Sequence, residues 1–209
     1  MIIKIIGDGV ISSGDYEEVK VVGTATSSGD FNTNILRVTG ELDSDFNISA
    51  ETARIVGNCS FNDATMKEVT IVGEVDCSNL ESEIITITGD VKASKLKATK
   101  INVKGAKLTI DEMNADQLDI RNAVGYVKSI VGEKIKIYRR IKFLIFLTSK
   151  KRLSVDEIEG DNIYIEHVDA KKVTGDHIVI GPNCNIEVLD AKTMKIDKSS
   201  FVKVGANNE

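Results

Sequence analysis

The sequence is poor in the residues that interrupt or diversify a chain. Its 209 residues include no tryptophan, one proline (Pro182) and two histidines, and aromatic residues make up only 5%. The sequence contains no linker rich in proline, glycine or serine, so a division into separate linked domains is disfavoured. The shortage of aromatic side chains is typical of a narrow interior filled by aliphatic ones. Hydrophobic residues make up 42% and charged residues 28%, which indicates a globular rather than a disordered chain.

Cysteine is also scarce, and the three cysteines lack the spacing of a metal site. We interpret Cys59 and Cys77 as small core residues, because a free thiol packs like a small hydrophobic group. The opening run, Met1 to Ile6, is too short for the apolar part of a signal peptide. We therefore expect a cytoplasmic protein without a metal or cofactor. The formal net charge of -5 argues against nucleic acid as its main partner.

What the sequence does contain is a regular repeat. Val19-Lys20-Val21-Val22-Gly23 returns in similar form along the chain, and its closing glycines are Gly7, Gly23, Gly40, Gly57, Gly73, Gly89 and Gly105. These glycines are 16 or 17 residues apart. The second apolar residue of each run forms a longer series: Ile5, Val21, Val38, Ile55, Ile71, Ile87, Val103, Ile120, Ile137, Ile165, Ile180 and Ile196. A fixed period of this length determines the architecture.

The repeat predicts an all-β chain that forms a single-domain parallel β-helix, a solenoid of about twelve coils with a period of 15–17 residues. Alternation of apolar and polar residues is typical of half-buried strands, and it does not match the spacing of an amphipathic helix. Stacked coils pair their backbone groups with the coils above and below. At about 4.8 Å per coil, the rod would be roughly 55–60 Å long.

One insertion interrupts the repeat. Ile137 and Ile165 are 28 residues apart, instead of the usual 16 or 17. We therefore predict N-terminal coils over residues 1–137, an inserted loop over 138–152, C-terminal coils of the same solenoid over 153–204, and a tail over 205–209.

The inserted loop combines cations with a short apolar run and contains no acid. The residues concerned are Arg139, Arg140, Lys142, Phe143, Leu144, Ile145, Phe146, Leu147, Lys150, Lys151 and Arg152. Five apolar residues cannot span a bilayer, but such a run flanked by Lys and Arg can insert at an anionic membrane surface. The alternative is that the run packs on the solenoid or against a second copy. Nucleic-acid binding is the least favoured interpretation.

The ends of the predicted solenoid are a second candidate site. A β-helix exposes unpaired strand edges and an open interior at both ends unless a cap covers them, and the sequence predicts no capping helix. We predict end-to-end assembly through Ile3, Ile5, Phe201, Val202 and Val204. The alternative for Phe201 is that its ring fills the interior of its own coil.

A third feature is a series of cations at equivalent positions: Lys4, Lys20, Arg37 and Arg54. Stacked like charges repel one another unless neighbouring acids or an anionic partner offset them. A solvated face is the simpler interpretation, and a site for an anionic partner is the other.

Catalytic residues are not recognisable in the sequence. His167 and His177 each follow an acid, and neither has the companion residues of a metal or nucleophile site. No carboxylate cluster recurs at one position, as cleavage of a polysaccharide would require. We expect that the protein is not an enzyme. A β-helix enzyme and a non-polymerising binding module remain as alternatives.

The repeat resembles that of the bactofilins, the polymer-forming bacterial cytoskeletal proteins. The resemblance rests on the Val-x-Val-x-Gly runs and on two later segments, residues 158–166 and 178–184, and it covers nearly the whole chain. The sequence looks like a longer variant, of the kind found in Gram-positive bacteria. The resemblance implies a right-handed β-helix that assembles through its ends into nonpolar filaments without nucleotide. It also implies roles in cell shape or cell-envelope organisation, with the chain itself, envelope proteins and the inner face of the membrane as partners.

Two features depart from the family. Bactofilins usually carry disordered, often proline-rich tails, whereas this sequence has almost none. Members commonly reach the membrane through a short N-terminal segment, but here the loop over 139–152 is the better candidate.

Overall fold

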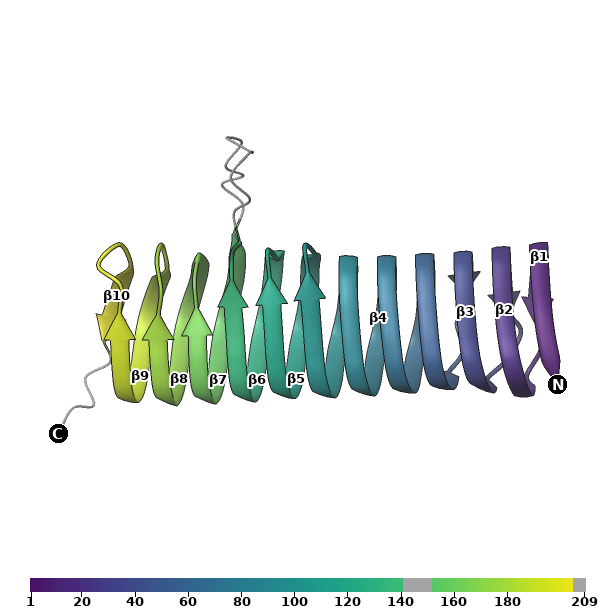
Figure 1. Cartoon of the computed structure of the whole chain (residues 1–209), viewed down its shortest axis with the longest axis horizontal. Helices are drawn as coiled ribbons and strands as arrows, with labels where there is room; N and C mark the ends of the chain where they lie inside the picture. Colours follow the sequence, from purple (N-terminus) through teal and green to yellow (C-terminus); the bar gives the residue numbers. More distant parts are fainter. Residues whose placement is uncertain (141–151, 205–209) are drawn as a thin grey trace.

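The computed structural model describes residues 1–140 and 152–204, except for the side chain of Val204. It is an all-β solenoid of about 11 turns with 86% of its residues in strands. Successive coils stack into a straight rod with β1 at one end and β10 at the other (Figure 1). The strands are β1 (Ile2–Ile11), β2 (Gly14–Ser27), β3 (Phe31–Asp43), β4 (Ile48–Lys104), β5 (Lys107–Arg121), β6 (Val124–Tyr138), β7 (Leu153–Ile165), β8 (Val168–Ile180), β9 (Asn185–Ile196) and β10 (Phe201–Val204). This confirms the predicted fold class.

All strands belong to one parallel sheet in which each pairs with its neighbours in sequence order. The pairing register aligns the predicted apolar series from coil to coil, as in Ile5 with Val21 and Ile165 with Ile180. Eleven of the twelve members of this series are buried, and they form the core of the rod together with the inward residues of the other sides. The twelve members of the series lie on twelve successive coils, and about eleven turns lead from the first to the last. This agrees with the predicted number of about twelve coils.

A stack of glycines forms one corner of the first coils. At Gly57, φ is +126°, and a Cβ atom would lie 2.0 Å from the carbonyl oxygen of Gly40 in the coil before. The same close approach recurs at Gly23, Gly40, Gly73 and Gly89. Both the backbone angle and the close contact exclude a side chain, which explains why glycine recurs with the period of the coil.

Later coils turn the same corner in another way. Asn122, His167 and Asn183 adopt φ values of 55–57°, in the left-handed region that asparagine tolerates better than most residues. Gly105 adopts a similar φ of +61° and has open space where a side chain would lie. Here the corner needs one left-handed residue but no close contact between backbones.

The sheet continues past the inserted residues. Gly125 of β6 pairs with Leu153 of β7, and Ile137 pairs with Ile165, so the two coils stack in register. The chain leaves the rod after Tyr138, at the corner that His167 forms in the next coil.

All three cysteines are free and buried, as predicted for Cys59 and Cys77. Burial raises the pKa of the Cys77 thiol from 9.0 to about 12 and also raises that of Cys59. A thiol that stays protonated is a poor nucleophile and a poor metal ligand. These two residues therefore act as packing groups.

Candidate functional site: the two ends of the rod

The N-terminal end of the rod exposes a strand edge and aliphatic side chains. Strand β1 pairs with β2 on one side and with no strand among residues 1–140 and 152–204 on the other. Met1, Ile2, Ile6 and Val10 are all exposed, with Ile6 at 71%. An edge of this kind offers backbone donors and acceptors to another strand.

The two predicted N-terminal contact residues lie deeper than these. Ile3 is partly buried against the core, and only 9% of Ile5 is exposed. The Ile5 side chain turns into the space above Gly9, where an added Cβ would lie 2.8 Å from Ile5 Cγ2. Ile5 therefore closes part of the interior of its own coil, and the exposed residues around it form the outer surface of this end.

The C-terminal end is covered only in part. The short strand β10 pairs with β9 at Asn185, Ile186 and Leu189, and no described strand pairs with the far side of β9 beyond these residues. Ile196 is 37% exposed, whereas Ile180, the residue before it in the same series, is 1% exposed. Met194 is exposed to a similar extent. Among residues 152–204, nothing covers the interior of the rod beyond these two side chains.

Phe201 lies at the rim of this opening rather than inside it. Phe201 pairs with Asn185 in the coil before. It is thus the last member of an outward-facing series that consists of Tyr126, Ser154, Asp169, Asn185 and Phe201. Its side chain is 61% exposed, so its ring does not fill the interior. Val202 takes the inward position and packs against the core. Val204 pairs with Leu189.

The loop predicted to contact the membrane lies almost wholly outside the described residues, which omit 141–151. Of its cations, Arg152 pairs with Asp169 at 2.9 Å, and the backbone amide of Arg140 donates a hydrogen bond to Asn122 at 2.8 Å. Arg140 also lies 5.8 Å from the centre of the Tyr138 ring. The backbone amide of Arg139 donates to Glu166 at 3.4 Å.

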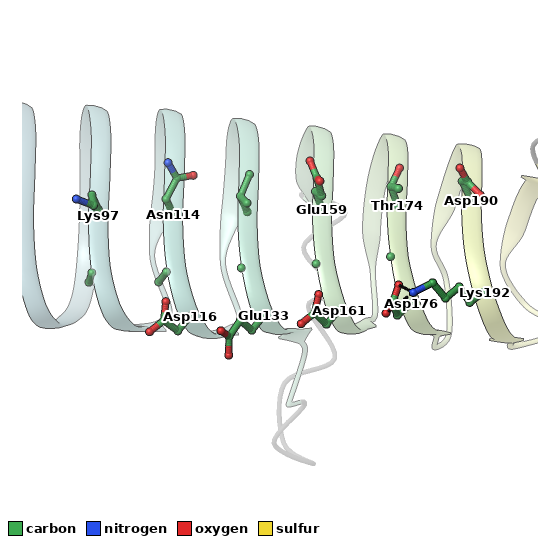
Figure 2. A pocket seen from close by; sticks show the side chains of 16 residues that line it. Lys97, Asn114, Asp116, Glu133, Glu159, Asp161, Thr174, Asp176, Asp190 and Lys192 are labelled. Carbon is green, nitrogen blue, oxygen red and sulfur yellow. Dashed lines mark hydrogen bonds and ion pairs between the residues drawn. The ribbon is translucent and has the colours of Figure 1, made fainter.

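A groove of about 610 Å³ runs along one side of the rod (Figure 2). Its acids include Asp116, Glu133, Asp161 and Asp176, which stand in a row with one residue on each coil (Figure 2). The expectation that no carboxylates recur at one position of the coil was therefore wrong. Among the described residues, no group of three or more potential ligands could hold a metal ion. In the same part of the chain, no helix has the length and apolar character needed to cross a membrane.

His167 and His177, the two histidines, lie on different coils. His177 Nδ1 is 2.6 Å from Thr193 Oγ1 on the exposed surface. Partial burial and the nearby Arg139 lower the pKa of His167, so that it stays neutral to a lower pH than a free histidine. His167 serves as the left-handed corner residue of its coil.

Two proteins of Bacillus subtilis (strain 168) are similar to part of this chain. The uncharacterized protein YhbF is 35% identical over 74 residues, which is 35% of this chain and 31% of YhbF. The uncharacterized protein YhbE is 33% identical over 82 residues, which is 37% of this chain and 35% of YhbE. The match thus spans about a third of each relative. No family model matches the chain, and no solved structure matches it.

Sequence reasoning missed six further apolar residues that are exposed at the ends: Met1, Ile2, Ile6, Val10, Met194 and Ile196. The signal was present for Met194 and Ile196, because they are the last members of the two inward series that the repeat provides. At the N-terminal end, alternation would have assigned Ile2 and Ile6 to the outer face.

Proposed function

We propose that this protein is a structural, non-catalytic scaffold whose rods join end to end into filaments. The observation that carries the proposal is the exposure of apolar residues beside an unpaired strand edge at both ends of the described rod, with Ile6 at one end and Ile196 at the other. Joining two ends would remove this apolar surface from water and would pair the free strand edges. The resemblance to bactofilins supports the same assembly and suggests a role in cell shape or envelope organisation.

Two alternatives remain testable. A β-helix enzyme would need a catalytic constellation, and the place for one would be the groove beside Gly132 and Gly160, which rows of acids line. A non-polymerising binding module would stay monomeric and would bind an anionic partner in a salt-dependent manner. The state of assembly therefore distinguishes the scaffold from both alternatives.

The Phe201→Arg variant tests whether the C-terminal rim takes part in the joint. We expect a folded monomer that no longer polymerises, because a charge at a rim buried in the joint would lose its hydration. Sedimentation velocity measures the loss of polymer, and circular dichroism checks the fold.

Tyr126→Arg provides a matched control. Tyr126 belongs to the same outward series as Phe201 and is 40% exposed, but it lies in the middle of the rod. We expect this variant to polymerise like the wild type. Normal polymers of Phe201→Arg would remove Phe201 from the joint, and equal loss in both variants would indicate a lateral contact instead.

A further inference from the structure

The basic series Lys4, Lys20, Arg37 and Arg54 is the beginning of a longer series of outward side chains that runs the full length of the rod. A parallel outward series lies on each side of it, so that three series share one side of the rod. The strand register continues this central series with Thr70, Thr86, Asn102, Asp119, Lys136, Tyr164, Val179 and Lys195. The series before it is Ile2, Glu18, Ile35, Thr52, Glu68, Ile84, Lys100, Gln117, Lys134, Asn162, His177 and Thr193. The series after it is Ile6, Val22, Thr39, Val56, Val72, Thr88, Lys104, Arg121, Tyr138, Glu166, Gly181 and Asp197. We call these three series the basic face.

The basic face has a charge opposite to that of the rest of the rod. It contains ten Lys and Arg residues and five acids, although the whole chain has a net charge of -5. Six further cations belong to the inserted loop. The remaining residues contain eleven cations and 27 acids. The rod is therefore strongly polarised around its long axis, with a cationic face and anionic sides.

The cations of the basic face also differ in their partners. Among the described residues, Arg37 pairs with Glu18, and none of the other nine has a carboxylate within ion-pair distance. On the other sides of the rod, five lysines pair with carboxylates at 2.7–3.0 Å: Lys92, Lys95, Lys97, Lys171 and Lys192. Most cations of the basic face are thus available to an anion outside the chain.

Aliphatic side chains lie between these cations. Ile2, Ile6, Val22, Val72, Ile84 and Val179 are exposed members of the basic face. The boundary between lipid headgroups and acyl chains accommodates both kinds of group, because cations contact the phosphates while aliphatic side chains enter the apolar layer. A nucleic-acid backbone or the acidic side of a second rod would use the cations but would leave the aliphatic groups without a matching surface.

We infer that the basic face binds an anionic lipid membrane, with the rod lying lengthwise on its surface. The 26 acids of the described residues outside the basic face would be repelled by the same membrane, which fixes which face turns toward it. The contact does not depend on whether the rods join at their ends. If they do join, a filament would repeat the face along its length and bind more tightly through multivalency.

Vesicle flotation tests this inference, because protein that floats must be bound to lipid, whereas filaments alone would sediment. The vesicles contain phosphatidylcholine with or without phosphatidylglycerol. We expect the full chain to float only with the anionic vesicles, and less at high salt. The double variant Lys20→Gln, Arg54→Gln should bind roughly thirtyfold more weakly, because each cation near such a surface contributes roughly fivefold.

The matched control is Lys67→Gln, Lys107→Gln, which removes the same charge from the other sides of the rod. It should float like the wild type. Equal weakening in both double variants, or no flotation of the wild type, would overturn the inference. A variant with residues 139–152 replaced by one asparagine should still float, and its failure to float would assign the contact to that segment instead. Bundling without vesicles that requires Lys20 and Arg54 would identify a second copy as the partner.

Discussion

At the scale of single residues, the glycine stack sets how closely the coils can approach at their corner. Gly57 has both a φ of +126° and a carbonyl oxygen 2.0 Å from its missing Cβ, whereas Gly105 has a positive φ and open space. The two positions separate the effect of steric overlap from that of backbone strain. Glycines at equivalent positions of the repeat are therefore required on different grounds: both backbone angle and lack of space at Gly57, and backbone angle alone at Gly105.

We expect Gly57→Ala to lower the free energy of unfolding by about 3 kcal/mol, since it combines overpacking with an unfavourable φ. Gly105→Ala should cost only about 1 kcal/mol, the strain of a left-handed alanine. Urea denaturation followed by circular dichroism measures both. Similar losses at the two positions would show that the close contact at Gly57 contributes nothing.

The sequence was sufficient to identify the residues that point inward, because side-chain direction alternates along a strand and the coil has a constant length. It could not show how exposed the end residues are. Ile5 and Ile196 are equivalent in the repeat, yet one is 9% and the other 37% exposed. Neither residue has a described coil on its outer side, but Ile5 packs into the space above Gly9, within 2.8 Å of where a Cβ of that glycine would lie.

At the scale of elements, the insertion after β6 leaves the pairing of the coils unchanged. β6 and β7 pair from Gly125–Leu153 to Ile137–Ile165, although 28 residues separate the last two partners. The next coil closes the same corner with only Glu166 and His167 between Ile165 and Val168. A corner of two residues is therefore long enough to connect β6 to β7.

We expect that a chain in which one asparagine replaces residues 139–152 folds with a free energy of unfolding within about 1 kcal/mol of the wild type. Asparagine suits the position because Asn122 adopts a φ of 55° at the same corner. Thermal and urea denaturation measure the change. Loss of the folded state would mean that the segment contributes to the core of the rod.

The interruption of the repeat was visible in the sequence, but the basic face beyond Arg54 was not recognised from it. Its cations move from the central series to the flanking ones at Lys100, Lys104, Arg121 and Lys134. A search along one series of equivalent positions therefore misses them. Only the register of all three series shows that they share one side of the rod.

At the scale of the whole molecule, the described part of the rod has an unpaired strand edge at each end and one cationic side. The two features share only Ile2 and Ile6, because the ends expose apolar residues beside free strand edges, whereas the side exposes cations without a carboxylate partner among the described residues. Assembly through the ends would leave the basic face free along the entire filament. A scaffold of this kind could therefore lie on a membrane and still grow at both ends.

Electron microscopy of the negatively stained, untagged full chain at physiological salt tests the central claim most directly. We predict filaments whose subunit repeat is close to the length of the rod, roughly 55–60 Å for coils spaced at about 4.8 Å. Uniform short rods at all protein concentrations would contradict end-to-end assembly and would favour a monomeric binding module.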